Sequence, residues 1–138
     1  MAKKNFEKFK QDLEKKKLAK VYLFSGPQED LKKEGLKLLC SALLPPGSES
    51  FNLDQREVNQ FEMAEMVNLV STLPWGASKR IVALFKADQL KLEQRHQLAE
   101  LVDKVPETTC LVVTAEKIPE AEILFKAVQK AGEVIEFS

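Results

Sequence analysis

Residues 20–33 carry the pattern in this chain that could bind a phosphate. An apolar run over 20–24 is followed by a short turn at Gly26 and then by polar residues typical of a helix start. A phosphate-binding loop, G-x-x-x-x-G-K-[ST], would lie at this place. Its backbone N–H groups surround the phosphates, its lysine reaches the terminal phosphates, and its hydroxyl group holds Mg²⁺. Counted from Gly26, Lys32 occupies the lysine position.

Two other positions of that loop do not fit nucleotide binding. Leu31 stands where a second glycine must let the backbone approach a phosphate, and Lys33 stands where the hydroxyl group is needed. Phe85 ends a later apolar strand at the place where ATPases of this class carry an acidic residue near Mg²⁺. Asp88 follows it and is expected to cap the next helix. The sequence therefore predicts a nucleotide-binding architecture that has lost its nucleotide, with no cofactor, metal ion or catalytic residue.

The remaining reactive side chains have no partner in the sequence pattern. His96 is the only histidine and lies in a polar helical stretch, so we expect it at the surface. Cys40 and Cys110 lie in apolar segments and are expected to be buried free thiols in a reducing compartment. There is no C-x-x-C or His/Cys cluster, which argues against a zinc site. Ser25 and Thr114 end strands, but no base lies near them in the sequence, so neither is assigned as a nucleophile.

Length and composition indicate one globular domain over residues 1–138. Lysine plus arginine and aspartate plus glutamate number 21 each, and this balance argues against a surface dedicated to nucleic acid. No apolar leader and no apolar run of about 18 residues is present, which predicts a cytoplasmic protein without a membrane span. The sequence stops directly after its last expected strand, and we expect it to be a fragment of a longer protein.

Strand-like and helix-like segments alternate along the chain. Strands are expected at 20–24, 50–54, 79–85, 109–114 and 133–137, and helices at 5–17, 29–44, 60–72, 92–105 and 121–130. Asn59 is expected to cap the third helix and Pro119 to lie in the first turn of the last one. This alternation predicts an α/β fold, in which a five-stranded parallel sheet carries helices on both faces.

The loop at 71–79 contains the only tryptophan of the chain. Pro74 must end the preceding helix because proline lacks an N–H group and clashes with the turn before it. Trp75 therefore lies in a loop at the rim of the sheet, where loops usually face solvent. An aromatic side chain there is either folded back onto the domain or available to a partner, and tryptophan is frequent among interface hot spots.

The helix before this loop has more apolar surface than one buried face requires. One face can be lined by Phe61, Ala64, Val67, Val70 and Leu73, while Met63, Met66 and Leu69 lie elsewhere around the helix. Methionines suit adaptable binding surfaces. Periodicity leaves two alternatives open, which are a partner-binding helix and a helix packed between the sheet and a neighbouring element.

The order of these motifs resembles the N-terminal domain of the bacterial DNA polymerase III delta subunit, a clamp-loader protein. The similar segments are LAKVYLFSG at 18–26, LLPP at 43–46, FNLD at 51–54, TLPW at 72–75, KRIV at 79–82, ADQL at 87–90, TAEK at 114–117 and AGEVIEF at 131–137. Together they extend over almost the whole chain.

This resemblance implies an AAA+-type α/β domain with a degenerate phosphate loop that does not hydrolyse ATP. It implies that the domain binds the ring-shaped sliding clamp, the beta subunit, and favours opening of the ring during DNA replication. Delta proteins continue into a small helical domain and a helical collar, which would join the other clamp-loader subunits. DNA would be reached only through the whole assembly.

The resemblance also implies a binding site. In the family, a loop before the third strand presents adjacent large apolar residues to a hydrophobic pocket on the clamp. The implied partner-binding residues are Met66, Val70, Leu73, Pro74, Trp75 and Gly76. Trp75 fits this role, whereas Gly76 departs from it, because the family commonly has a second bulky side chain there. Either Trp75 and Leu73 supply the whole contact, or clamp binding is weak.

Two other functions stay open from the sequence. One is a nucleotide-binding enzyme that uses Lys32 in an atypical phosphate loop. The other is a scaffold domain that binds only other clamp-loader subunits.

Overall fold

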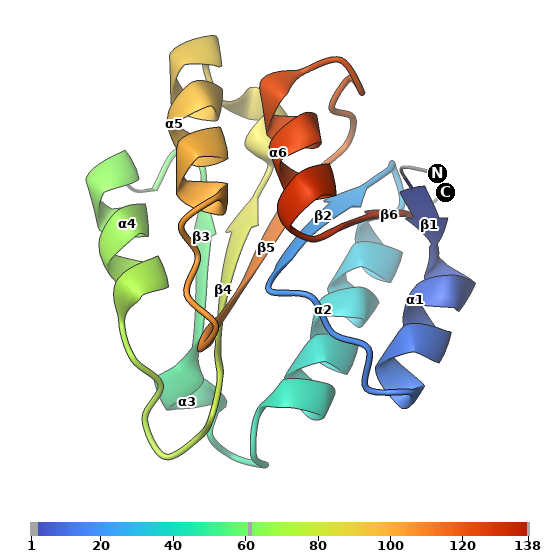
Figure 1. Ribbon diagram of the computed structural model, residues 1–138, viewed down its shortest axis with the longest axis vertical. Coiled ribbons are helices and arrows are strands. Elements are labelled where there is room, and N and C mark those ends of the chain that lie inside the picture. The colour runs from blue at the N-terminus through green and yellow to red at the C-terminus, as the bar shows by residue number, and fades with distance from the viewer. Residues whose placement is uncertain (1–2, 61, 138) are drawn as a thin grey trace.

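A parallel sheet in the order β1-β6-β2-β5-β4-β3 forms the centre of the computed structural model, which describes residues 3–60 and 62–137 (Figure 1). The strands are β1 Lys3–Asn5, β2 Val21–Ser25, β3 Leu53–Glu57, β4 Arg80–Phe85, β5 Thr109–Ala115 and β6 Glu133–Glu136. The parallel α/β fold is confirmed, but the predicted number of five strands is wrong, because the described residues form six. The additional strand, β1, pairs with β6, and its polar sequence Lys-Lys-Asn carries no apolar pattern that could reveal it.

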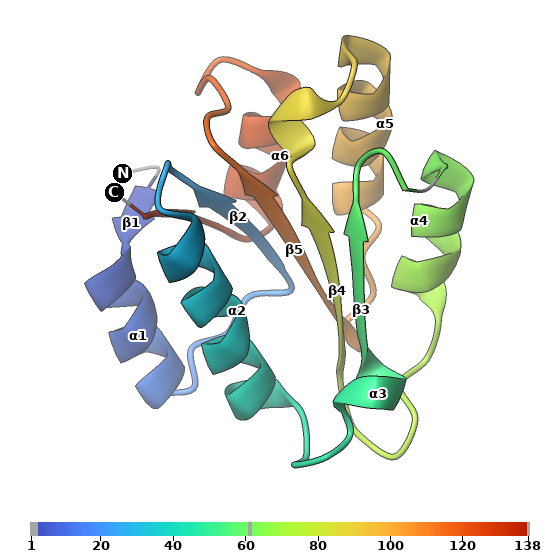
Figure 2. The ribbon, with the colours of Figure 1, turned by 180° about the vertical axis from the view of Figure 1, so that it is seen from behind.

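Helices cover both faces of the sheet (Figures 1 and 2). Their bounds are α1 Phe6–Glu14, α2 Glu29–Leu43, α3 Glu49–Asn52, α4 Met63–Ser71, α5 Leu92–Val102 and α6 Ile123–Ala131, with a 3₁₀ turn, η1, at Ala87–Gln89. The α1 and α2 helices lie on one face, and α4, α5 and α6 lie on the other. Among the described residues, no helix combines the length and the apolar character needed to cross a membrane.

Each face of the sheet has its own apolar core. Successive residues of a strand point to opposite faces, and on β2 Val21 and Leu23 pack beneath α4–α6 while Tyr22 and Phe24 pack beneath α1 and α2. Coverage on both sides explains why the central strands are continuous apolar runs instead of alternating ones. Gly35 lies in this second core: a Cβ atom there would be 3.0 Å from the ring of Phe137.

The segment predicted as a strand at 50–54 folds differently. The backbone N–H groups of Phe51 and Asn52 both donate to the carbonyl of Ser48 at 3.0 Å, which closes the helical turn α3. The strand starts only at Leu53, so the prediction is shifted. The alternation of Phe51 and Leu53 suggested a strand, but backbone hydrogen bonds to Ser48 place Phe51 in a helical turn.

Three predicted helix starts are also corrected. The α4 helix begins at Met63 with Glu62 as its N-cap residue, not Asn59. The α6 helix begins after Glu122, so Pro119 lies before the helix. Asp88 does not cap α5. Its carboxylate instead accepts from the backbone N–H of Glu116 at 3.1 Å and joins η1 to the loop after β5.

Candidate protein-binding site

The loop between α4 and β4 is tied to α3 by the side chain of Asn52. The amide nitrogen of Asn52 donates to the backbone carbonyl of Trp75, and the amide oxygen accepts from the backbone N–H of Trp75, both at 2.8 Å. Asn52 is completely buried. Its amide satisfies both backbone groups of Trp75, so the position of the backbone at Trp75 is fixed while its side chain remains free to face outward.

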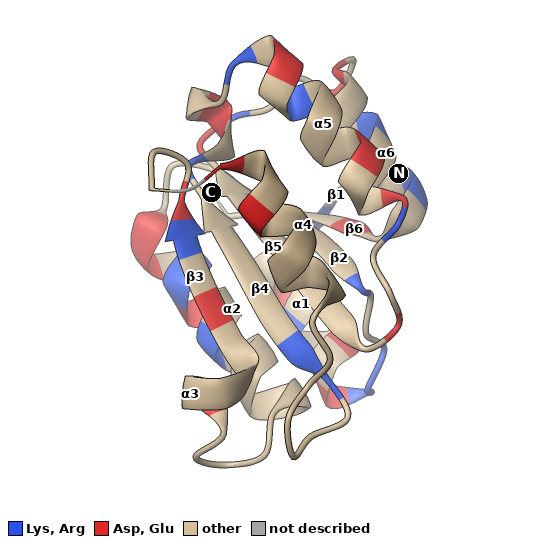
Figure 3. Cartoon of the chain, turned by 90° about the vertical axis from the view of Figure 1, so that its left-hand side faces the viewer, with Lys and Arg blue, Asp and Glu red and all other residues tan. Residues whose placement is uncertain are grey.

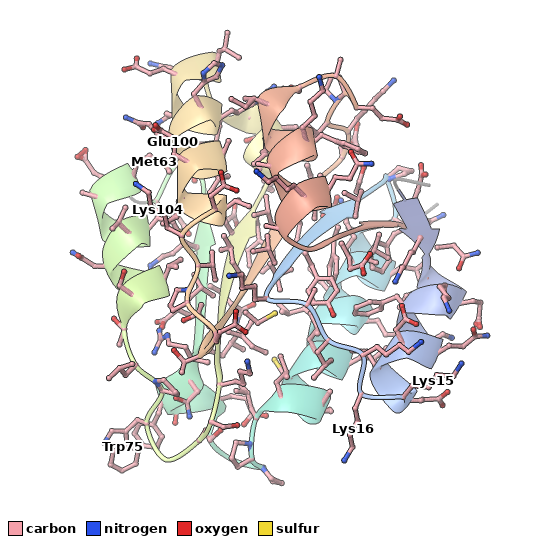
Figure 4. The ribbon with its side chains drawn as sticks, viewed as in Figure 1. Lys15, Lys16, Met63, Trp75, Glu100 and Lys104 are labelled. Atoms are coloured by element: carbon pink, nitrogen blue, oxygen red, sulfur yellow. The ribbon has the colours of Figure 1, made fainter. Side chains whose placement is uncertain are left out.

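Three large apolar side chains are exposed around this contact. Phe51 is 57% exposed, Leu73 72% and Trp75 68%. The rings of Phe51 and Trp75 lie with their centroids 4.9 Å apart and their planes inclined by 42°. Figure 4 shows Trp75 at the tip of the loop, pointing away from the rest of the fold. We call Phe51, Leu73 and Trp75 the aromatic corner. Single exposed apolar residues are common, but two exposed rings in contact, with Leu73 two positions before Trp75 in the same loop, mark a candidate interaction site.

The two ends of this loop are anchored in the fold as well. At its start, the hydroxyl group of Thr109 on β5 donates to the carbonyl of Val70 at 2.8 Å. At its end, the buried guanidinium group of Arg80 pairs with the carboxylate of Asp54 on β3. With the Asn52 contact near the middle, the loop is held at three places. Such a loop is preorganised, and this lowers the ordering cost of binding.

Pro74 and Gly76 contribute backbone geometry more than contact area. Pro74 is half-buried. Gly76 has φ of +68°, in the left-handed region that favours glycine, and a Cβ atom there would meet nothing within 4 Å. The backbone conformation therefore favours glycine at this position, although there is room for a larger side chain. The side chain adjacent to Trp75 in space is Phe51, which the sequence did not connect with the loop.

Met66 and Val70 do not belong to this surface. Met66 is 0% exposed and Val70 1%, and both pack in the core beneath α4 together with Leu98 and Val102 of α5. At Met66 and Val70 the structure therefore agrees with the second alternative, a helix packed between the sheet and a neighbouring element. Val67 is the large apolar side chain of α4 that remains exposed. Phe61, expected on the same face, lies outside the described residues.

The turn that would hold a phosphate is short and already occupied by protein contacts. Only residues 26–28 separate β2 from α2. The backbone N–H of Gly26, which would face a phosphate, is shared between the carbonyls of Ala115 at 3.2 Å and Glu116 at 3.0 Å. Lys32 is buried, and its ammonium group donates to the Ala115 carbonyl at 3.2 Å and pairs with Glu29 at 2.7 Å. The lysine therefore bridges α2 and β5.

Acidic side chains lie close to this turn, together with lysines. The first turn of α2 carries Glu29 and Asp30, at the end of a helix where a bound anion would have to lie. A cavity of about 120 Å³ beside Lys32 is also lined by Asp88, Glu116 and Lys86. No cluster of three or more potential metal-ligating side chains exists among the residues that the structure describes.

Other side chains considered from the sequence lie as follows. His96 is exposed, and Ser25 and Thr114 are buried at strand ends. Burial raises the pKa of the Cys110 thiol to about 12 and that of the Cys40 thiol to about 11. Both cysteines are free and buried, which confirms that part of the prediction. At ordinary pH neither is a thiolate nucleophile.

The fold and its exposed loop define an α/β domain with a parallel sheet, in which the aromatic corner lies at the amino ends of the strands and the Gly26 turn lies at their carboxyl ends. The family model described as "DNA polymerase III, delta subunit" matches residues 22–138. The chain belongs to this family. The resemblance drawn from the motifs is thereby confirmed.

Solved structures support the same fold. The Bacillus subtilis DNA clamp loader delta protein (YqeN) superposes with a TM-score of 0.83 at 19% identity, over 94% of this chain and 41% of that one. A DNA polymerase III gamma subunit-related protein from Thermotoga maritima gives a TM-score of 0.67 at 12% identity, over 96% of this chain and 45% of that one. This chain thus spans less than half the length of either protein. A search of curated protein sequences gives no significant match.

Proposed function

We propose that this chain is a non-catalytic clamp-loader domain that binds the sliding clamp through the aromatic corner and favours opening of the ring during DNA replication. The observation that carries the proposal is Trp75, which is 68% exposed on a loop anchored at three places, in a member of the delta family. Other clamp-loader subunits would be contacted through parts of the protein beyond this chain, in the cytoplasm, and DNA only through the assembly.

The chemistry of the corner supports a protein partner. A fully buried tryptophan covers about 150–250 Å². Because Trp75 is 68% exposed, a partner can still cover about two-thirds of that area, and about 25 cal/mol per Å² then gives a gross gain of roughly 2.5–4 kcal/mol. The net gain is smaller because association has its own cost, but the loop needs little ordering. No residue between Ser71 and Lys79 is charged, so an apolar pocket can cover the loop without desolvating a charge (Figure 3).

Ring opening requires a difference in affinity between two clamp states. A ligand shifts an equilibrium only by as much as it binds one state more tightly than the other. The domain would therefore act as a wedge that binds the clamp better when one ring interface is open. Because Lys32 and Gly26 are engaged with the protein itself, nucleotide-driven changes would come from other subunits.

Calorimetry with a purified bacterial sliding clamp tests this function. Trp75→Ala is expected to weaken binding about 30-fold or more, the loss of a hot-spot residue. Leu92→Ala is the matched control, because Leu92 is also an exposed apolar residue (64%) but begins α5 at the opposite end of the molecule (Figure 1). Equal affinities of wild type and a folded Trp75→Ala variant would contradict the proposal, and binding only to other loader subunits would favour a scaffold role.

A further inference from the structure

We infer that Phe51 and Trp75 together form a two-ring contact for the clamp, and that Asn52 is the positioning residue that holds the two rings side by side. This inference rests on the proposed function and deepens it, because it adds a contact from α3 to a loop that follows α4. It also specifies the partner surface, which is an apolar pocket wide enough for two adjacent aromatic rings.

The exposure of Phe51 carries the first step. A ring that only supported Trp75 from beneath would be buried, whereas Phe51 is 57% exposed and presents its own apolar surface. Its centroid lies 4.9 Å from that of Trp75, within the range of favourable aromatic contacts. Burial of one ring by a partner therefore also covers much of the other, and Leu73 is a third exposed apolar side chain on the same loop as Trp75.

Gly76 adds no side chain to the contact, so any second ring must come from elsewhere in the fold. A single aromatic side chain on the loop offers limited area, and the residue that follows it has no side chain to add. The left-handed backbone at Gly76 disfavours a bulky residue there. Phe51 supplies from α3 the apolar bulk that the loop lacks. Clamp binding then does not depend on a side chain at residue 76.

Asn52 links the two rings through one side chain. It follows Phe51 directly in the chain, and its amide binds both backbone groups of Trp75 at 2.8 Å. The contact requires a donor and an acceptor on the same planar group, which the asparagine amide provides. An aspartate would place a carboxylate oxygen against the Trp75 carbonyl, and a leucine would leave both backbone groups unpaired.

A double-mutant cycle on clamp binding tests the two-ring contact. We expect Phe51→Ala to weaken binding about 10-fold, and the double variant with Trp75→Ala to lose less than the product of the single losses, because neighbouring contacts are coupled. Phe51→Leu, which keeps apolar volume, is expected to retain most affinity, and Leu92→Ala is expected to change nothing. If Trp75→Ala weakens binding while Phe51→Ala does not, the two-ring inference fails and the proposed function stands. If neither variant weakens binding, the proposed function itself fails.

To test whether Asn52 positions the loop, the measurement must report on the loop itself and not on the overall stability of the fold. Trp75 is the only tryptophan, so its fluorescence anisotropy and its quenching by acrylamide report the loop directly. Asn52→Asp is expected to lower the anisotropy of Trp75 and to weaken clamp binding at least 5-fold. Thr109→Val is the control, because it removes the hydrogen bond at the start of the loop but leaves the Asn52 contact intact. Unchanged anisotropy and affinity in folded Asn52→Asp, or equal losses in both variants, would overturn the positioning role.

Discussion

The ammonium group of Lys32 donates a hydrogen bond to the backbone carbonyl of Ala115 at 3.2 Å, across the junction of α2 and β5. The same group pairs with Glu29 at 2.7 Å. A phosphate-loop lysine extends toward the nucleotide, whereas this one is buried and bound to the protein. The side chain therefore contributes to packing at the place where its chemistry suggested ligand binding.

Replacement of Lys32 by methionine separates these two roles. Lys32→Met keeps most of the volume but removes the donor to Ala115, so we expect a loss of about 1–2 kcal/mol in the free energy of unfolding, measured in urea. We expect Mg-ATP to leave the melting temperature of both proteins unchanged. A rise in the melting temperature of the wild type with Mg-ATP that is absent in Lys32→Met would instead support the nucleotide-binding enzyme.

Gly76 is expected to respond to substitution through its backbone alone. Gly76→Ala places a Cβ atom on a residue with φ of +68° and should cost about 1–2 kcal/mol in the free energy of unfolding. Gly76→Asn should cost less, because asparagine tolerates this region better. Denaturant unfolding of both variants provides the measurement. An alanine variant as stable as the wild type would show that the loop can adopt another conformation at this residue.

Asp12 should make stability depend on pH. Its carboxylate accepts from Lys4 at 2.8 Å and pairs with Lys8 at 3.4 Å. The hydrogen bond from Lys4 lowers the pKa of Asp12, against the opposing effect of burial. The folded-state pKa thus lies below the unfolded value of about 3.9. The resulting stabilisation is present above that value and is lost as pH falls through the lower, folded pKa.

The measurement for Asp12 compares unfolding free energies of wild type and Asp12→Asn between neutral pH and pH 3. The variant is expected to be less stable at neutral pH, and the difference is expected to shrink below about pH 4, as the wild-type carboxylate becomes protonated. A difference that stays constant over this range would show that the ion pair with Lys4 does not contribute to stability.

Gly132 is predicted to tolerate no side chain. A Cβ atom there would overlap the backbone carbonyl of Val21, on a central strand that cannot easily move. Gly132→Ala should therefore destabilise the fold by about 3 kcal/mol or more. Gly47→Ala is the control, since Gly47 has a left-handed φ of +82° but nothing within 4 Å of the added atom. Circular dichroism during urea unfolding compares them, and equal stabilities would contradict the steric argument.

Several features of this protein could be predicted from the sequence because they depend on local chemistry. The apolar runs at 20–24, 79–85 and 109–114 correspond closely to β2, β4 and β5, since a strand covered on both faces must be apolar throughout. Pro74 ends the helix before Trp75, and the tertiary structure leaves that side chain exposed. The order of the motifs indicated the delta family.

Other features were decided only by the tertiary structure. Periodicity indicates which residues of α4 are apolar but not what covers them, and α5 buries Met66 and Val70. The β1 strand exists through backbone pairing with β6, which leaves no signal in side-chain type. The Asn52 amide meets the backbone of Trp75 because adjacent parallel strands bring α3 and the α4–β4 loop to the same end of the sheet. Such a contact joins distant parts of the chain, so only the fold can show it.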